Sequence, residues 1–123
     1  MAHILIAEDD TSLCQILSLA LQNAGHTVQT AHDGLEGLAM LEAAGENPFD
    51  VLVTDIVMPG MDGIELSQKA VARMPAIKVI FITGFTAVAA HTQGAQPAQA
   101  ETLAKPFHIN SLVQRIEALL TST

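Results

Sequence analysis

DVLVTDIVMPGMDG, residues 50–63, places an aspartate directly behind a short apolar run. The run, residues 51–53, is rich in β-branched side chains, which indicates a buried strand of a sheet that is covered on both faces. Asp55 then lies at the carboxyl end of this strand, and the loop behind it contains a proline and two glycines. Open α/β sheets carry their chemistry at the carboxyl ends of their strands. We therefore take Asp55 as the centre of a candidate site.

Three further apolar segments also run directly into polar side chains. They are residues 4–7 before Glu8 and Asp9, residues 78–82 before Thr83, and residues 102–104 before Lys105. The carboxyl ends of parallel strands meet at one edge of their sheet. The sequence therefore predicts an acid cluster, a hydroxyl and one cation around Asp55.

Strand and helix patterns alternate along the chain. The expected strands cover residues 4–7, 27–31, 51–53, 78–82 and 102–104. The expected helices run from an N-cap at Thr11 or Ser12 to Gly25, from residues 33–34 to Gly45, from about 64 to 74, and from about 109 to 120. This order predicts an α/β domain with a doubly wound, five-stranded parallel sheet and right-handed crossovers.

The segment between the fourth and fifth strands does not follow this pattern. Residues 84–100 carry no charge and contain a glycine and a proline in their second half. We expect at most a short or irregular fourth helix there, because these residues end helices early. A loop and a partner-binding surface both fit the segment.

The charge of the chain argues against nucleic acid as a partner. The formal net charge is −8, and the five Lys and Arg residues are scattered along the sequence. Proteins that bind phosphate backbones cluster their positive charge. We expect no nucleic-acid partner.

Other bulk features narrow the protein class further. The 123 residues suffice for one domain, and no apolar run approaches the length of a membrane span. No signal-peptide pattern is present, so we expect a cytoplasmic protein without a membrane partner. The single cysteine, Cys14, leaves no disulfide framework and is expected as a small apolar residue on the first helix. The five histidines lack the spacing of a zinc site, and His108 is expected at the start of the last helix.

Glu8-Asp9, Asp55, Thr83 and Lys105-Pro106 lie in this order on alternating elements. Together they resemble the receiver domain of response regulators, which has a flavodoxin-like (CheY-like) fold. The resemblance covers residues 1–123 and leaves nothing over for an output domain, so it implies a single receiver domain.

The resemblance implies a phosphoacceptor rather than an enzyme. Asp55 would take a phosphoryl group from a phosphohistidine on a histidine kinase or a histidine phosphotransfer protein, with Mg²⁺ as cofactor. Asp9 and Asp55 would bind the ion directly, the Val57 backbone carbonyl would add a ligand, and Glu8 would act through water. Asp10 could also bind the ion, but we expect it to help cap the first helix.

The same resemblance assigns the remaining polar groups. Lys105 and Thr83 would contact the phosphoryl oxygens, and the bond between Lys105 and Pro106 would be cis.

Many receivers carry Tyr or Phe at the position of Thr102 and rotate it on phosphorylation. Thr102 cannot do this, so we expect the output in residues 84–100. Gly84 would absorb the backbone shift, and Phe85, Val88 and His91 would be the contact residues.

Four segments resemble a group of stand-alone receivers: residues 54–59, 61–66, 81–85 and 105–108. That resemblance implies control of the ClpXP protease, with the unphosphorylated protein acting as an adaptor. We expect the protein to be a monomer. The alternative is a phosphate shuttle or sink in a phosphorelay. A third class, an aspartyl phosphatase of another α/β family, usually has a second acid where this chain has Val57.

Overall fold

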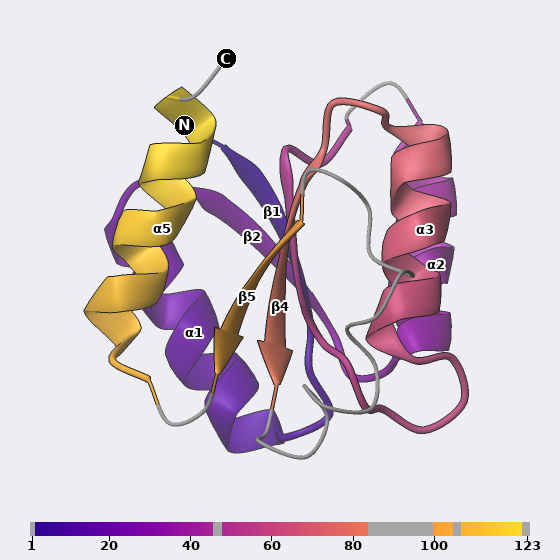
Figure 1. Ribbon diagram of the computed structural model, residues 1–123, viewed down its shortest axis with the longest axis horizontal. Coiled ribbons are helices and arrows are strands. Elements are labelled where there is room, and N and C mark those ends of the chain that lie inside the picture. Colours follow the sequence, from indigo (N-terminus) through magenta and orange to yellow (C-terminus); the bar gives the residue numbers. More distant parts are fainter. Residues whose placement is uncertain (1, 46–47, 84–99, 105–106, 122–123) are drawn as a thin grey trace.

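The computed structural model describes residues 2–45, 48–83, 100–104 and 107–121 (Figure 1). Its elements are β1 (His3–Ala7), α1 (Thr11–Asn23), β2 (Thr27–Ala31), α2 (Gly34–Ala43), β3 (Val51–Asp55), α3 (Gly63–Arg73), β4 (Lys78–Thr83), β5 (Ala100–Ala104) and α5 (Ile109–Thr121). The five strands form one parallel sheet in the order β2-β1-β3-β4-β5. This confirms the doubly wound α/β fold. The expected fourth helix falls on residues outside the described part of the chain.

Helices cover both faces of the sheet, as Figure 1 shows, with α1 and α5 on one side and α2 and α3 on the other. The two-residue period of the strands sends their apolar side chains alternately to these two layers. In β1, Leu5 packs on the α2 and α3 side, whereas Ile4 and Ile6 pack on the α1 and α5 side. All three are fully buried, which explains why the strands read as continuous apolar runs.

The N-cap of the first helix lies one residue before the first of the two expected caps. Asp10 is the N-cap of α1, and its carboxylate accepts a hydrogen bond from the Leu13 N–H at 3.1 Å. Thr11 and Ser12 already lie inside the helix, so the expectation that one of them caps it is wrong. All three residue types make good caps, and the extended backbone of Asp10 decides between them.

The last helix packs as its apolar pattern predicts. Leu112 and Ile116 are fully buried against the α1 and α5 side of the sheet, and Leu119 and Leu120 are half-buried against the same cluster. The carbonyl of His108 accepts the N–H of Ser111 at 3.0 Å, which places His108 at the start of the helix as expected.

Across the described ranges, no helix is both long and apolar enough to cross a bilayer.

Cys14 lies on the inner face of α1 with 2% of its surface exposed. Burial raises the pKa of its thiol above the usual value, the negative charge of Glu8 raises it further, and a hydrogen bond with Thr30 opposes this shift. The position agrees with the expected role of a small apolar residue. A buried thiol with a raised pKa is a poor nucleophile, because only the thiolate attacks.

Cys14 should therefore react slowly with a disulfide reagent at pH 8 while the chain is folded. The raised pKa keeps the thiol protonated, and burial blocks access, so the reaction should speed up sharply in urea. Stopped-flow thiol labelling across a urea series measures this. Equal rates in the folded and unfolded chain would contradict the burial of Cys14.

Candidate functional site

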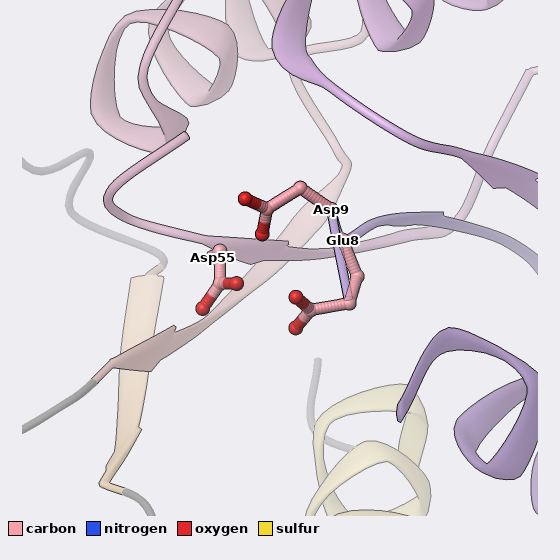
Figure 2. A group of neighbouring side chains, drawn as sticks. All are labelled: Glu8, Asp9 and Asp55. Carbon is pink, nitrogen blue, oxygen red and sulfur yellow. The ribbon is translucent and has the colours of Figure 1, made fainter. Parts of the chain in front are cut away.

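Three carboxylates meet at the carboxyl edge of the sheet (Figure 2). Glu8 and Asp9 directly follow β1, and Asp55 is the last residue of β3. Each offers one oxygen, and these oxygens all lie within 4.8 Å of one another. The pairing of the strands brings these carboxylates together, because β1 and β3 are neighbours in the sheet and Ala7 is in register with Thr54. The structure therefore brings together the three acids that the sequence placed at this edge.

The three acids differ strongly in their exposure. Glu8 and Asp55 are 1% and 6% exposed, whereas Asp9 is open to solvent. Glu8 accepts a hydrogen bond from the Asp10 N–H at 3.0 Å, and its own N–H donates to the Ala31 carbonyl at 3.0 Å. The bond to Ala31 continues the pairing of β1 and β2, and the bond from Asp10 holds the Glu8 carboxylate against the start of α1. Asp10 itself turns its carboxylate to α1 and lies outside the cluster.

The backbone at Asp55 and Ile56 is held by two residues whose roles sequence reasoning did not assign. The Thr54 hydroxyl donates to the Asp55 carbonyl at 2.9 Å, and the Gly63 N–H donates to the Ile56 carbonyl at 2.7 Å. A Cβ atom on Gly63 would stand 1.8 Å from the Asp55 carbonyl oxygen, so this approach requires glycine. A hydroxyl inside a buried apolar run needs a partner, and that was the available signal for Thr54.

The ends of β4 and β5 lie at the same edge. Asp55 is in register with Ile82, and Thr83, the last residue of β4, pairs with Ala104 at the end of β5. The side chain of Thr83 lies outside the described part of the structure. So do the remaining expected site and switch residues, which are Lys105, Pro106, Gly84, Phe85, Val88 and His91.

Two further expected residues can be placed. Val57 lies in the loop two residues beyond Asp55, and its side chain is 58% exposed. Thr102 lies in β5 with its side chain exposed, and it is in register with the fully buried Phe81 of β4. The metal-binding role of the Val57 carbonyl stays a prediction.

Replacing Thr54 by valine should loosen the peptide that follows Asp55. Valine keeps the shape but not the donor, so we expect a loss of about 0.5–1.5 kcal/mol in unfolding free energy. Hydrogen exchange of the Ile56 amide should also become faster. Thr54→Ser keeps the hydroxyl and serves as the matched control, with Ile56 exchange as in the wild type. Unchanged Ile56 exchange in Thr54→Val would show that the hydroxyl does not hold this peptide.

Comparison with known proteins agrees with this geometry. The model of the response regulator receiver domain matches residues 4–117. CpdR, a response regulator receiver protein of Brucella abortus (strain 2308), is 45% identical over 120 residues, which are 98% of either chain. The chain spans about half the length of other curated relatives, which are 31% and 33% identical to it.

Solved structures give the same result. The chemotaxis response regulator CheY4 of Vibrio cholerae matches with a TM-score of 0.82 at 30% identity, covering 97% of this chain and 98% of that one. TrrA of Thermotoga maritima, solved in complex with Mg(2+)-BeF, matches with a TM-score of 0.79 at 25% identity, covering 97% and 99%. Together with the acid cluster at the end of β1 and β3, these matches show that the chain belongs to the response regulator receiver domain family.

Proposed function

We propose that the protein is a phosphorylation-controlled switch in which Asp55 accepts a phosphoryl group from a phosphohistidine on a histidine kinase or a histidine phosphotransfer protein. The cluster of Glu8, Asp9 and Asp55 carries this proposal, because it surrounds one nearly buried carboxylate with two others. The protein acts as the acceptor in this transfer and turns over no separate substrate, so we do not class it as an enzyme.

The donor set fits Mg²⁺. All three groups offer carboxylate oxygens, which this ion prefers, at about 2.0–2.1 Å from the metal. Two oxygens on one ion therefore lie at most about 4.2 Å apart. Because the cluster extends to 4.8 Å, not every acid needs to touch the ion. Asp9 and Asp55 would bind directly with the Val57 carbonyl, and Glu8 would act through water. The solved Mg(2+)-BeF complex of TrrA supports this choice.

The transfer needs one new bond and one broken bond. A carboxylate oxygen of Asp55 attacks the phosphorus, the phosphorus–nitrogen bond breaks, and the partner's imidazole leaves with its electron pair. The product is an acyl phosphate on Asp55. Bound Mg²⁺ would neutralise negative charge around the phosphoryl group. Thr83 and Lys105, at or just beyond the ends of the adjoining strands, would contact the phosphoryl oxygens.

The output is proposed to be protein binding of the CpdR type. Identity of 45% over nearly the full length of both chains favours a stand-alone receiver. We therefore infer that the unphosphorylated protein binds the ClpXP protease as an adaptor and that phosphate on Asp55 withdraws the binding surface. Since Thr102 is exposed and not aromatic, residues 84–100 are proposed as this surface.

The charge pattern favours a protein partner over nucleic acid. Arg73 pairs with Glu42 at 3.6 Å, and Arg115 pairs with Glu101 at 2.8 Å. Two of the five basic residues are thus already neutralised by acids on the surface. We propose a cytoplasmic monomer that does not bind nucleic acid.

The phosphoacceptor is tested with a small phosphodonor such as phosphoramidate. Labelling should require Mg²⁺, disappear in Asp55→Ala, and need more Mg²⁺ in Asp9→Asn, because one direct ligand is weakened. Asp50→Asn, at the opposite end of β3, is the matched control and should label normally. Mass spectrometry of the intact protein gives the extent of labelling. Full labelling of Asp55→Ala would place the acceptor elsewhere.

The output is tested by capturing ClpX on immobilised protein with and without the phosphodonor. ClpX should bind the wild type without phosphate, leave on phosphorylation, and stay bound to Asp55→Ala under both conditions. Val88→Glu should weaken binding while leaving labelling intact. If ClpX binds in neither state although Asp55 is labelled, the protein is better described as a phosphate shuttle or sink.

A further inference from the structure

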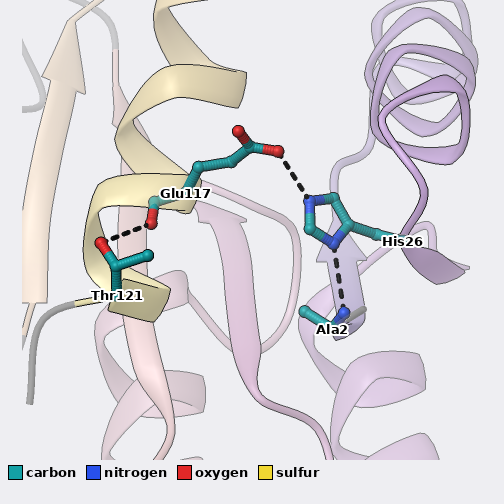
Figure 3. Close-up of polar contacts among 4 residues, drawn as sticks. All are labelled: Ala2, His26, Glu117 and Thr121. Carbon is teal, nitrogen blue, oxygen red and sulfur yellow. Dashed lines mark hydrogen bonds and ion pairs between the residues drawn. The ribbon is translucent and has the colours of Figure 1, made fainter.

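His26 lies at the end of the sheet opposite the acid cluster, in the turn between α1 and β2 (Figure 3). Its backbone is fixed by the way α1 ends. Gly25 has a φ of 100°, its N–H donates to the Gln22 carbonyl at 3.0 Å, and the His26 N–H donates to the Leu21 carbonyl at 3.1 Å. This is a Schellman motif, in which glycine supplies the left-handed residue. The motif holds the start of the His26 side chain in one place.

The imidazole of His26 faces two segments that are distant in sequence. Its side chain is 7% exposed, and its Nδ1 accepts a hydrogen bond from the Ala2 N–H at 3.2 Å. Its Nε2 faces the Glu117 carboxylate of α5, with 3.6 Å between Nε2 and Oε2 (Figure 3). That distance is too long for a hydrogen bond. Nε2 has no hydrogen-bond partner among the described residues.

The contact with Ala2 decides where the proton sits. A neutral imidazole has one donor and one acceptor nitrogen, whereas an imidazolium has two donors. Because Nδ1 accepts from Ala2, the single proton of neutral His26 lies on Nε2. A second proton would have to sit on Nδ1 and would point at the Ala2 N–H. Protonation of His26 and its bond to Ala2 therefore exclude each other.

We propose that His26 is a proton-operated latch between the start of the chain and α5. Neutral His26 holds Ala2 through Nδ1 and leaves Glu117 at a distance. Protonated His26 releases Ala2 and draws the Glu117 carboxylate into an ion pair through Nε2–H. Histidine is the side chain that ordinarily changes its charge between about pH 5 and 8.

The charges around His26 make Glu117 its main electrostatic partner. Neither α1 nor β2 contains Lys, Arg, Asp or Glu. On α5, Arg115 is engaged by Glu101 of β5 at 2.8 Å. On β1, the His3 ring stacks on Phe49, on the α2 and α3 side of the sheet.

Two further titratable groups need to be separated from His26. Cys14 lies on α1, and its thiol has a raised pKa, so it stays neutral where histidine titrates. The amino group of Met1 precedes Ala2 and lies outside the described residues. A variant that lacks only the imidazole distinguishes the amino group from the latch.

The latch would make the position of α5 depend on pH. The Arg115–Glu101 pair ties α5 to β5, and the His26–Glu117 contact ties its last turns to the α1–β2 turn. The Thr121 hydroxyl donates to the Glu117 carbonyl at 3.1 Å, which fixes the helix backbone at this point (Figure 3). A change in the His26–Glu117 contact therefore acts on a hydrogen-bonded part of α5.

The test is an NMR titration of the 123-residue chain between pH 8 and pH 5. The ring nitrogens of His26 should show the Nε2–H tautomer at pH 8. The amides of Ala2 and Glu117 should then shift with the same midpoint as the His26 ring, with hydrogen exchange becoming faster at Ala2. His26→Gln keeps an acceptor for Ala2 and a donor for Glu117 but cannot titrate, so both amide transitions should vanish.

Two controls make the outcome decisive. Glu117→Gln, at an exposed side chain, should lower the midpoint of His26, because it removes the charge that stabilises the imidazolium. His3→Gln removes a histidine on the other face and should leave the Ala2 and Glu117 transitions unchanged. The Nδ1–H tautomer at pH 8, or the same amide transitions in His26→Gln, would overturn the proposal. An unchanged His26 midpoint in Glu117→Gln would do so as well.

Discussion

Three carboxylates within 4.8 Å repel one another, and the pairing of β1 with β3 forces them together. Two unit charges 4 Å apart interact by about 4 kcal/mol where the effective dielectric constant is about 20. The hydrogen-bonded pairing of β1 with β3 holds the backbone that carries these acids in place. A divalent cation bound as proposed would reduce the repulsion between these carboxylates.

The parts of the fold that follow from local sequence were predictable. Short β-branched runs marked β1, β3 and β4, and the acids behind β1 and β3 could meet only if the sheet was parallel. The expectation that Thr11 or Ser12 caps α1 was wrong because Asp10, Thr11 and Ser12 are all good caps, whereas the expectation that Asp10 helps cap this helix is confirmed. Thr54 was missed because strand patterns record burial and not the partner that a buried hydroxyl finds.

The remaining features depend on contacts between distant parts of the chain. His26 meets Ala2 and Glu117, which are 24 and 91 residues away, only after α1 has ended in its left-handed turn and α5 has packed on the sheet. No periodic pattern marks such a meeting. The uncharged residues 84–100 lack both helical and strand periodicity, so the sequence could suggest their role in output but not their conformation.

The acid cluster and His26 act at opposite ends of the sheet, and α5 connects the two ends (Figure 1). Its 13 residues span roughly 20 Å, since an α-helix rises 1.5 Å per residue. β5 ends at the edge that carries the acid cluster, α5 is the next element of the chain, and Glu117 lies near the end of α5. Leu112 and Ile116 pack the helix as one body against the sheet. If α5 moves as one body, a shift imposed at one end changes the contact at the other. The phosphoryl group and the proton would then be coupled inputs to one element, each altering the affinity of the domain for the other.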